Sequence, residues 1–162
     1  MSTGTNSSDL SKLPASYRDF YFACTEFIPE IRIYSDPLRT LAFGTDASVY
    51  RLTPKLVVKV RSGDEVARIL GIASQHAIPV TFRAAGTSLS GQAVTDSVLL
   101  VLAGGWSTYS ITPDGKAISL EPGIIGSEAN AYLKSFSRKI GPAWYSKSAS
   151  GDCLNTAGTM NG

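Results

Sequence analysis

Residues 83–92 form the part of this chain whose residue types are best suited to bind a ligand. They combine two glycines with small and hydroxyl side chains, and they lie between two apolar runs of strand length. Glycines allow positive φ angles that turn several backbone N–H groups toward one point, and small side chains let a ligand approach. The hydroxyls add donors and Arg83 offers a guanidinium, so we predict a site for an anion such as a pyrophosphate. The candidate residues are Arg83, Ala84, Ala85, Gly86, Thr87, Ser88, Leu89, Ser90, Gly91 and Gln92.

The residues of this loop leave an alternative open, because ordinary tight turns between strands are also rich in small residues. The loop lacks the Gly-Lys-Ser/Thr ending of a P-loop, and no G-x-G-x-x-G opens a helix after the first apolar strand. Neither of these common phosphate-binding motifs is therefore expected. The only histidine, His76, falls at the end of a predicted helix, where a cation suits the helix dipole, so we expect a structural or surface role.

The elements that must position this loop are predicted from hydrophobic spacing. Apolar residues at intervals of three and four predict a helix over 14–30, and a β-branched run predicts a strand over 56–60. Ser62 and Glu65 have the spacing of a capping box, so a second helix should begin there and end near His76. The predicted apolar face of that helix consists of Val66, Ile69, Leu70 and Ala73.

Further strands are expected over 78–82 and 97–102, and the order strand, helix, strand predicts a crossover unit with parallel strands. An Asp-Gly pair at 114–115 predicts a hairpin between 109–112 and 117–120, which would make the sheet mixed. Ser127 can cap a last helix that ends near Lys139. The expected class is α+β, with a small mixed sheet flanked by helices.

The composition is that of a folded domain. Hydrophobic residues make up 43% and charged residues 17%, and no apolar run is long enough to span a membrane. The formal net charge is +2 and the basic residues are scattered, so no nucleic-acid partner is expected. Cys24 and Cys153 form no CxxC motif and are expected to be free thiols. Since the polar first 13 residues, expected to be disordered, carry no secretion signal, we predict a cytoplasmic protein, with membrane association of the full-length protein left open.

The segment RAAGTSLSGQA resembles the R-G-G-G-T-S-L-x-G-Q pyrophosphate loop of FAD-linked oxidases of the vanillyl-alcohol oxidase (PCMH) type. The resemblance is to the branch that contains D-lactate dehydrogenase and the flavin subunit of glycolate oxidase. It extends to residues 36–50, to the strand at Val57 and Val58 with its capped helix, and to Glu121-Pro122-Gly123, so it covers roughly residues 34–142. The chain departs from the family at positions 84 and 85, where it has alanines and the family usually has glycines.

This resemblance implies an oxidoreductase that binds FAD in an extended form between two subdomains. Members take a hydride from the alpha carbon of a D-2-hydroxy acid such as D-lactate, and pass electrons to a quinone, a cytochrome or another acceptor. Residues 83–92 would bind the pyrophosphate, and Pro122 and Gly123 would lie close to the flavin. Because the loop lacks the histidine to which some members attach the flavin, non-covalent FAD is expected. No metal site is expected within this chain.

The resemblance also predicts that the chain is an N-terminal fragment. Residues 14–142 would form the first part of the FAD-binding domain, and residues 143–162 would be an irregular tail, truncated or divergent, because relatives continue there with D-P-A-S and T-x-G-G-x-x-x-x-N. The catalytic residues, the substrate-binding domain and any iron–sulfur extension would then lie beyond residue 162. An apolar surface left uncovered by truncation would favour oligomerisation.

Two other functions remain compatible with the sequence. The same loop could hold a nucleotide or other phosphate ligand in a non-catalytic binding module, since no Ser–His, Cys–His or paired-carboxylate arrangement is visible. The fold could also serve another flavin reaction, because related flavin domains occur in UDP-sugar reductases, sugar oxidases and amine oxidases.

Overall fold

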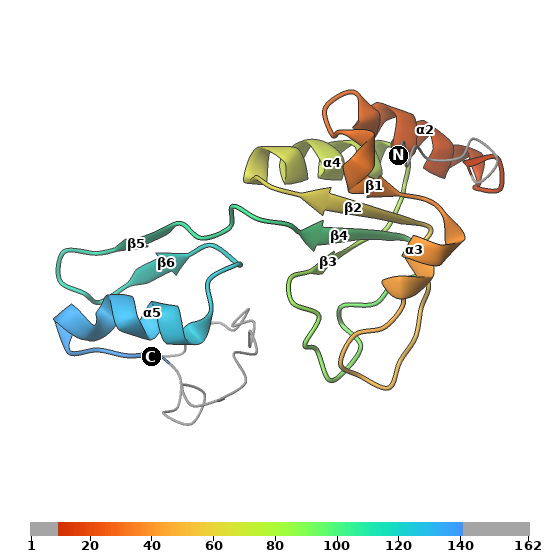
Figure 1. Cartoon of the computed structure of the whole chain (residues 1–162). Helices are drawn as coiled ribbons and strands as arrows, with labels where there is room; N and C mark the ends of the chain where they lie inside the picture. Colours follow the sequence, from red (N-terminus) through yellow and green to blue (C-terminus); the bar gives the residue numbers. More distant parts are fainter. Residues whose placement is uncertain (1–9, 141–162) are drawn as a thin grey trace. The chain divides into compact units, whose positions relative to one another are not determined.

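The computed structural model of the chain describes residues 10–140, which divide into two units. The first unit ends at Ala103 and the second begins at Gly104 (Figure 1). The first unit contains α2 (Ala15–Thr25), η1 (Glu30–Arg32), β1 (Ile33–Tyr34), α3 (Pro37–Ala42), β2 (Leu56–Val60), α4 (Gly63–Gln75), β3 (Val80–Arg83) and β4 (Val98–Leu102). The second unit contains β5 (Tyr109–Ile111), β6 (Ile118–Leu120), α5 (Gly126–Leu133) and η2 (Lys134–Phe136). The predicted tail at 143–162 and Cys153 lie outside the described residues.

The first unit is built on a four-stranded sheet in the order β1-β2-β4-β3. Strands β2 and β3 are both parallel to β4, and β1 is antiparallel to β2. The predicted parallel arrangement is confirmed, although β4 lies between the two strands that α4 connects. The α+β class with a mixed sheet and flanking helices is also confirmed. The prediction that the hairpin at 109–120 makes this sheet mixed was wrong. The two-residue strand β1 makes the sheet mixed, whereas the hairpin β5–β6 forms a sheet of its own.

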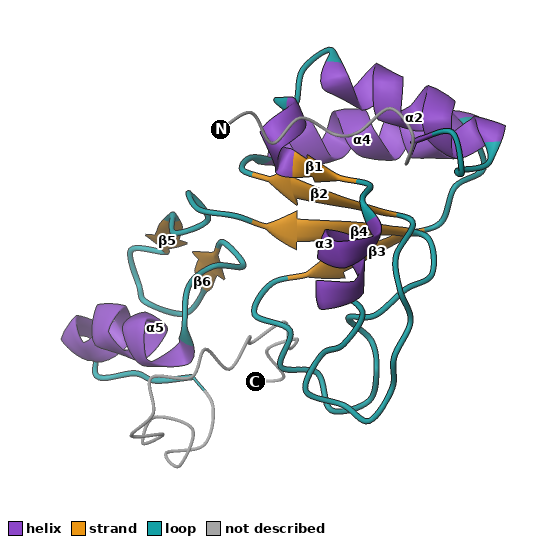
Figure 2. Cartoon of the chain, turned by 45° about the vertical axis from the view of Figure 1, so that its right-hand side comes forward, coloured by secondary structure: helices purple, strands orange, loops and turns teal. Residues whose placement is uncertain are grey.

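Helices α2 and α4 cover one face of this sheet (Figures 1 and 2). The largest fully buried side chains include Phe20 and Tyr21 of α2, Ile69 of α4 and the apolar residues of β2 and β4. Cys24 is buried and is a free thiol, as predicted, and burial raises its pKa to about 12. A thiol with that pKa stays protonated near neutral pH, so Cys24 serves as a core residue.

The opposite face of the sheet is covered in part by residues that flank α3. Tyr34 and Phe43 pack against Val57, Leu99 and Val101 on that face. Lys59 belongs to the buried strand β2, and its ammonium lies 5.1 Å from the centroid of the Tyr34 ring, within cation–π distance. This side of the sheet therefore accommodates a charged residue that the β-branched pattern alone would not place in a core strand.

The N-terminal cap of α4 agrees with the sequence prediction at Ser62 and differs from it at Glu65. The Ser62 hydroxyl accepts a hydrogen bond from Glu65 N at 3.2 Å, as predicted, and the helix ends at His76. The Glu65 carboxylate, however, accepts from Arg61 N and is held by two hydrogen bonds from Arg32, of 2.8 and 2.9 Å. The predicted apolar face was wrong at Leu70, which is 40% exposed, whereas Ile69 and Ala73 are the residues that α4 buries.

The Arg32–Glu65 pair predicts a specific dependence of stability on pH. Burial would raise the pKa of Glu65, but the hydrogen bonds from Arg32 and Arg61 and their charges outweigh it and hold the pKa below its usual range. The pair therefore stabilises the fold above the unfolded-state pKa of about 4.3, and this contribution is lost as the pH falls through the lower folded-state pKa. We expect Glu65→Gln to lower the free energy of unfolding by about 2 kcal/mol near neutral pH and to reduce its loss in acid.

Urea unfolding near pH 7 and near pH 3 measures both effects, with the exposed Glu26→Gln as the control variant. An acid dependence as steep in Glu65→Gln as in the unchanged chain would contradict the assignment.

The second unit consists of the hairpin β5–β6 and the helix α5. Gly115 has φ +65° at the hairpin turn, as the Asp-Gly pair predicted, and the Tyr109 and Tyr132 rings stack with centroids 3.8 Å apart. The predicted cap at Ser127 was wrong, since α5 begins at Gly126 and Ile125 N donates instead to the Glu128 carboxylate at 3.2 Å. The helix is also shorter than predicted, because the chain turns into η2 and then adopts a positive φ at Ser137. No helix within residues 10–140 is long and apolar enough to cross a membrane.

Candidate functional site

The predicted loop leaves the sheet at the end of β3 and returns to it at β4. Arg83 is the last residue of β3, and residues 84–97 form the connection. Gly86 and Gly91 have φ angles of +73° and +75°, whereas Ala84 and Ala85 are outside the positive-φ region. Glycine is therefore present at the two positions whose backbone requires it, and the alanines at 84 and 85 impose no backbone strain.

The backbone N–H groups at the tip of this loop are available to a ligand. Within residues 10–140, the amides of residues 86–89 donate to no protein acceptor, and Thr87 and Ser88 are only half-buried. Consecutive free N–H groups beside a positive φ form the kind of concave donor set that binds anions. This observation fits the predicted pyrophosphate, whose oxygens accept hydrogen bonds and carry negative charge.

The Ser88 side chain organises the turn of the loop. Its Oγ accepts hydrogen bonds from Ser90 N at 3.3 Å and from Gln92 N at 3.1 Å, and it donates a short hydrogen bond to the Gln92 carboxamide oxygen. Leu89 and Ser90 are exposed at the tip. Ser88 and Gln92 therefore hold the loop in shape through each other, while the exposed Ser90 hydroxyl is available for contact with a ligand.

Arg83 joins the two ends of the loop. The residue is only 7% exposed, and its guanidinium donates from Nε at 2.9 Å and from Nη2 to the carbonyl oxygen of Ala93. Burial lowers the pKa of Arg83 from its usual value, and the charge of Asp46 acts in the opposite direction. A guanidinium stays protonated under these conditions. Two of its donors are committed to the loop itself, so its predicted contact with a phosphate would have to use the rest of the group.

A second loop, residues 44–52, connects α3 to β2 and lies beside the first loop (Figures 1 and 2). Ala47 N donates to Gly86 O at 2.9 Å, and the Tyr50 ring lies next to Gly91. We did not predict contacts between these loops from the sequence. The available signal was that residues 36–50 belong to the segment that resembles the flavin family.

Asp46 carries the negative charge of this second loop. Its Oδ1 accepts hydrogen bonds from Ser48 N at 2.8 Å and from Ser48 Oγ, and its Oδ2 is buried without a partner among the described residues. Burial would raise the pKa of Asp46, but the Ser48 hydrogen bonds, the Ala93 backbone and the charge of Arg83 hold it below its usual range. Asp46 is therefore a carboxylate at neutral pH, and its charge acts on the buried Arg83.

Pro122 and Gly123 lie in the second unit, between β6 and α5. Gly123 N donates to Trp106 O at 2.9 Å, and a Cβ at this position would overlap the Trp106 carbonyl. Glycine is thus required for the close approach of two segments of this unit. The predicted position of these residues next to a flavin stays a prediction.

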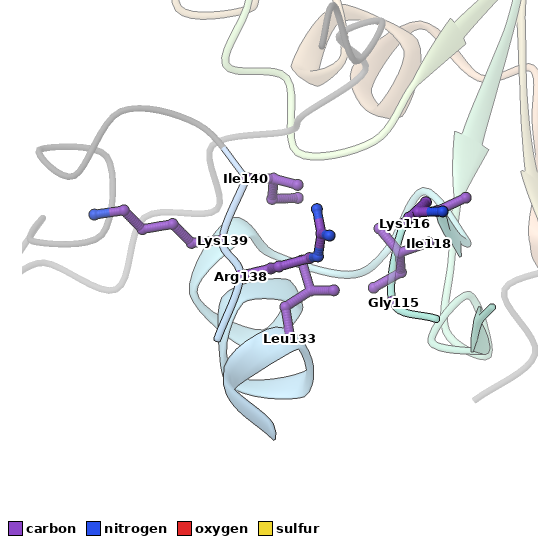
Figure 3. A pocket seen from close by; sticks show the side chains of 8 residues that line it. Gly115, Lys116, Ile118, Leu133, Arg138, Lys139 and Ile140 are labelled. Atoms are coloured by element: carbon purple, nitrogen blue, oxygen red, sulfur yellow. The ribbon is translucent and has the colours of Figure 1, made fainter. Parts of the chain in front are cut away.

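A cavity of about 210 Å³ also lies in the second unit (Figure 3). It is lined by the hairpin, by Leu133 of α5 and by residues 138–140, and Lys116, Arg138 and Lys139 contribute cationic side chains. Lys116 is paired with Asp114 at 3.1 Å. None of the predicted site residues lines this cavity. Within residues 10–140, no group of three or more His, Cys, Asp or Glu side chains could hold a metal ion.

Comparison with protein families gives a match over most of the chain. A model described as "FAD binding domain" matches residues 54–160, a range that contains the loop, α4 and the second unit. The glycolate oxidase subunit GlcD of Escherichia coli (strain K12) is 33% identical over 105 residues, which are 63% of this chain and 21% of that protein. The D-2-hydroxyglutarate dehydrogenase of the same strain is 30% identical over 128 residues, 75% of this chain and 13% of that protein.

Solved structures share the fold at lower sequence identity. An alkyldihydroxyacetonephosphate synthase matches with a TM-score of 0.59 and 17% identity, over 75% of this chain and 26% of that one. A p-cresol methylhydroxylase matches with a TM-score of 0.60 and 12% identity, over 78% of this chain and 26% of that one. The chain therefore spans about a fifth or less of the length of the two curated relatives, and about a quarter of these structures.

Proposed function

The chain belongs to the FAD binding domain family, and we propose on this basis that residues 83–92 bind the pyrophosphate of a non-covalently held FAD. The observation that carries the proposal is the donor set at the loop tip, where the amides of residues 86–89 have no protein acceptor among the described residues. Gly86 and Gly91 allow this shape through their positive φ angles. The exposed hydroxyl of Ser90 adds a further donor. No histidine lies in the loop to form a covalent bond to the flavin.

We propose further that the whole protein oxidises a D-2-hydroxy acid, similar to D-lactate, to the 2-oxo acid. The support is the chemistry named for the relatives, since glycolate and D-2-hydroxyglutarate are both 2-hydroxy acids. FAD supplies the hydride acceptor for such an oxidation. The residues described here bind and orient that cofactor, and we assign no catalytic residue within them. The quinone or other electron acceptor and the cytoplasmic location stay predictions from the sequence.

Purification of the complete gene product tests both proposals. We expect a yellow protein that releases FAD into solution on acid precipitation and that reduces an artificial dye with D-lactate, glycolate or D-2-hydroxyglutarate. A protein that carries no flavin and takes up none refutes the cofactor assignment. Flavin that remains with the precipitate refutes non-covalent binding, and a flavoprotein inactive with every 2-hydroxy acid refutes the substrate class.

Substitutions at Gly86 test whether the loop binds a phosphate. Asparagine and aspartate have nearly the same shape and both tolerate a positive φ, so Gly86→Asn and Gly86→Asp differ mainly in charge. An added side chain there first meets the flexible Arg83 side chain at 3.5 Å, so both variants should fold. We expect Gly86→Asp to bind FAD at least about tenfold more weakly than Gly86→Asn, because a carboxylate would repel the phosphates.

Fluorescence quenching during titration of the flavin-free protein measures the two affinities. Equal affinities for the Asn and Asp variants would place the phosphates away from Gly86. Riboflavin, which has no phosphate, serves as the control ligand and should not distinguish the variants.

A further inference from the structure

We propose that Asp46 and Tyr50, in the 44–52 loop, are positioning residues that set the shape of the 83–92 loop for its ligand. This inference rests on the proposed function, because the ligand is taken to be the FAD pyrophosphate. It adds a second segment of the chain to the site, one that acts through the first loop. Two contacts between the loops and one turn within the 44–52 loop carry the argument.

The first contact is a hydrogen bond at Gly86, the first residue of the 83–92 loop with a positive φ. Ala47 N donates to the carbonyl oxygen of Gly86 at 2.9 Å. Gly86 has φ +73° and begins the run of free amides at 86–89. Fixing the direction of the Gly86 carbonyl also fixes the plane of the peptide that carries the Thr87 N–H, because the peptide bond is planar. The 44–52 loop thus orients the Thr87 N–H, one of the donors of the anion site.

The second contact is at Gly91, the other residue of the 83–92 loop with a positive φ. Gly91 has φ +75°, and a Cβ built on it would lie 2.8 Å from Cδ2 of Tyr50. The Tyr50 ring therefore lies directly against the Gly91 backbone, although the residue is 57% exposed. The two residues that give the 83–92 loop its shape are each held by the 44–52 loop.

The third observation is a turn within the 44–52 loop, around the Ala47 amide. Asp46 Oδ1 accepts hydrogen bonds from Ser48 N at 2.8 Å and from Ser48 Oγ, so the Asp46 side chain fixes the turn that carries the Ala47 N–H. The charge of Asp46 also favours the protonated form of the buried Arg83, which joins the ends of the 83–92 loop through the Ala93 carbonyl.

The exposure of Tyr50 separates positioning from a general structural role. Truncation of a side chain that is more than half exposed usually changes the free energy of unfolding very little. Loss of the ring would still free the Gly91 backbone, and the loop would have to be ordered again when the ligand binds. Ligand affinity should therefore fall without a matching loss of stability.

The test compares FAD affinity, stability and amide hydrogen exchange in variants of the complete gene product. Tyr50→Ala is expected to bind FAD about tenfold more weakly, with faster exchange at residues 84–92 in the flavin-free protein and unchanged exchange in β2 and β4. Tyr50→Phe keeps the ring and should retain affinity within about twofold. Val49→Ala, at a neighbouring residue that is 95% exposed, is the matched control and should change neither FAD affinity nor hydrogen exchange.

Asp46 is tested with a similar pair. Asp46→Ala removes the acceptor of Ser48 and the charge near Arg83, whereas Asp46→Asn removes only the charge. We expect FAD affinity to be highest in the unchanged chain, lower in the Asn variant and lowest in the Ala variant. Equal affinity in all three would remove Asp46 from the proposal.

A double-mutant cycle examines the Tyr50–Gly91 contact directly. Gly91→Ala should weaken FAD binding less in the Tyr50→Ala background than in the unchanged chain, because the overlap with the ring is gone and only the backbone strain remains. Additive effects would show that the ring does not act on Gly91.

The outcomes distinguish this inference from the function on which it rests. If the unchanged protein binds no FAD, the proposed function fails, and hydrogen exchange still measures whether the 44–52 loop holds residues 84–92. If the protein binds FAD and Tyr50→Ala matches it in both affinity and exchange, the positioning role is refuted and the FAD site stands.

Discussion

Replacement of Gly91 by alanine should weaken FAD binding by about 30- to 100-fold. Alanine at a φ of +75° is strained by about 1–2 kcal/mol, and the new methyl group would lie 2.8 Å from the Tyr50 ring. Either the loop or the ring must move, and both support the free amides at 86–89. The loss should appear in binding more than in folding, because the loop tip is exposed and outside the core of the sheet.

Titration of the flavin-free protein with FAD measures this effect, with Gly71→Ala as the matched glycine control. Gly71 lies within α4, and an added Cβ there meets nothing within 4 Å. We expect that control to bind FAD normally and to gain a little stability from the higher helix propensity of alanine. Normal FAD affinity in Gly91→Ala would mean that the positive φ at this position does not shape the site.

Replacement of Arg83 by methionine should affect both stability and binding. The guanidinium is buried and donates to Ala93 O, so its removal leaves a buried carbonyl without a partner and the Asp46 carboxylate without its compensating charge. We expect the free energy of unfolding to fall by about 3 kcal/mol, and FAD affinity to fall because the ends of the 83–92 loop are no longer joined. Arg83→Lys keeps the charge and should restore stability and binding only in part, since an ammonium lacks the two-donor fork.

Urea unfolding followed by far-ultraviolet circular dichroism measures the stability of the variants, and FAD titration measures the binding. Lys139→Met, at an exposed residue with no ion pair among the described residues, is the control for the loss of one positive charge. If Arg83→Met were as stable as Lys139→Met, the hydrogen bonds to Ala93 would not hold the loop. If it lost stability yet bound FAD normally, Arg83 would have no part in the site.

The sequence by itself determined the features that depend on nearby residues. The run of small residues at 83–92 identified the loop, and glycine occupies the two positions, 86 and 91, where the backbone has a positive φ. Ser62 capped α4, and the Asp-Gly pair at 114–115 formed the hairpin. Propensity, capping and turn chemistry act over a few residues, so a linear pattern is enough to predict them. The family resemblance was confirmed by the match over residues 54–160.

Only the tertiary structure decided the features that join distant segments. Strand β1 has two residues, too few for a hydrophobic pattern, and it exists because it pairs with β2. Arg83 turned out to join the ends of the loop because burial makes the Ala93 carbonyl the partner that its donors need. The contacts of Ala47 with Gly86 and of Tyr50 with Gly91 join residues that are far apart in the sequence. Such long-range contacts leave no periodic signal in the sequence, since they depend on how the sheet brings two loops to the same place.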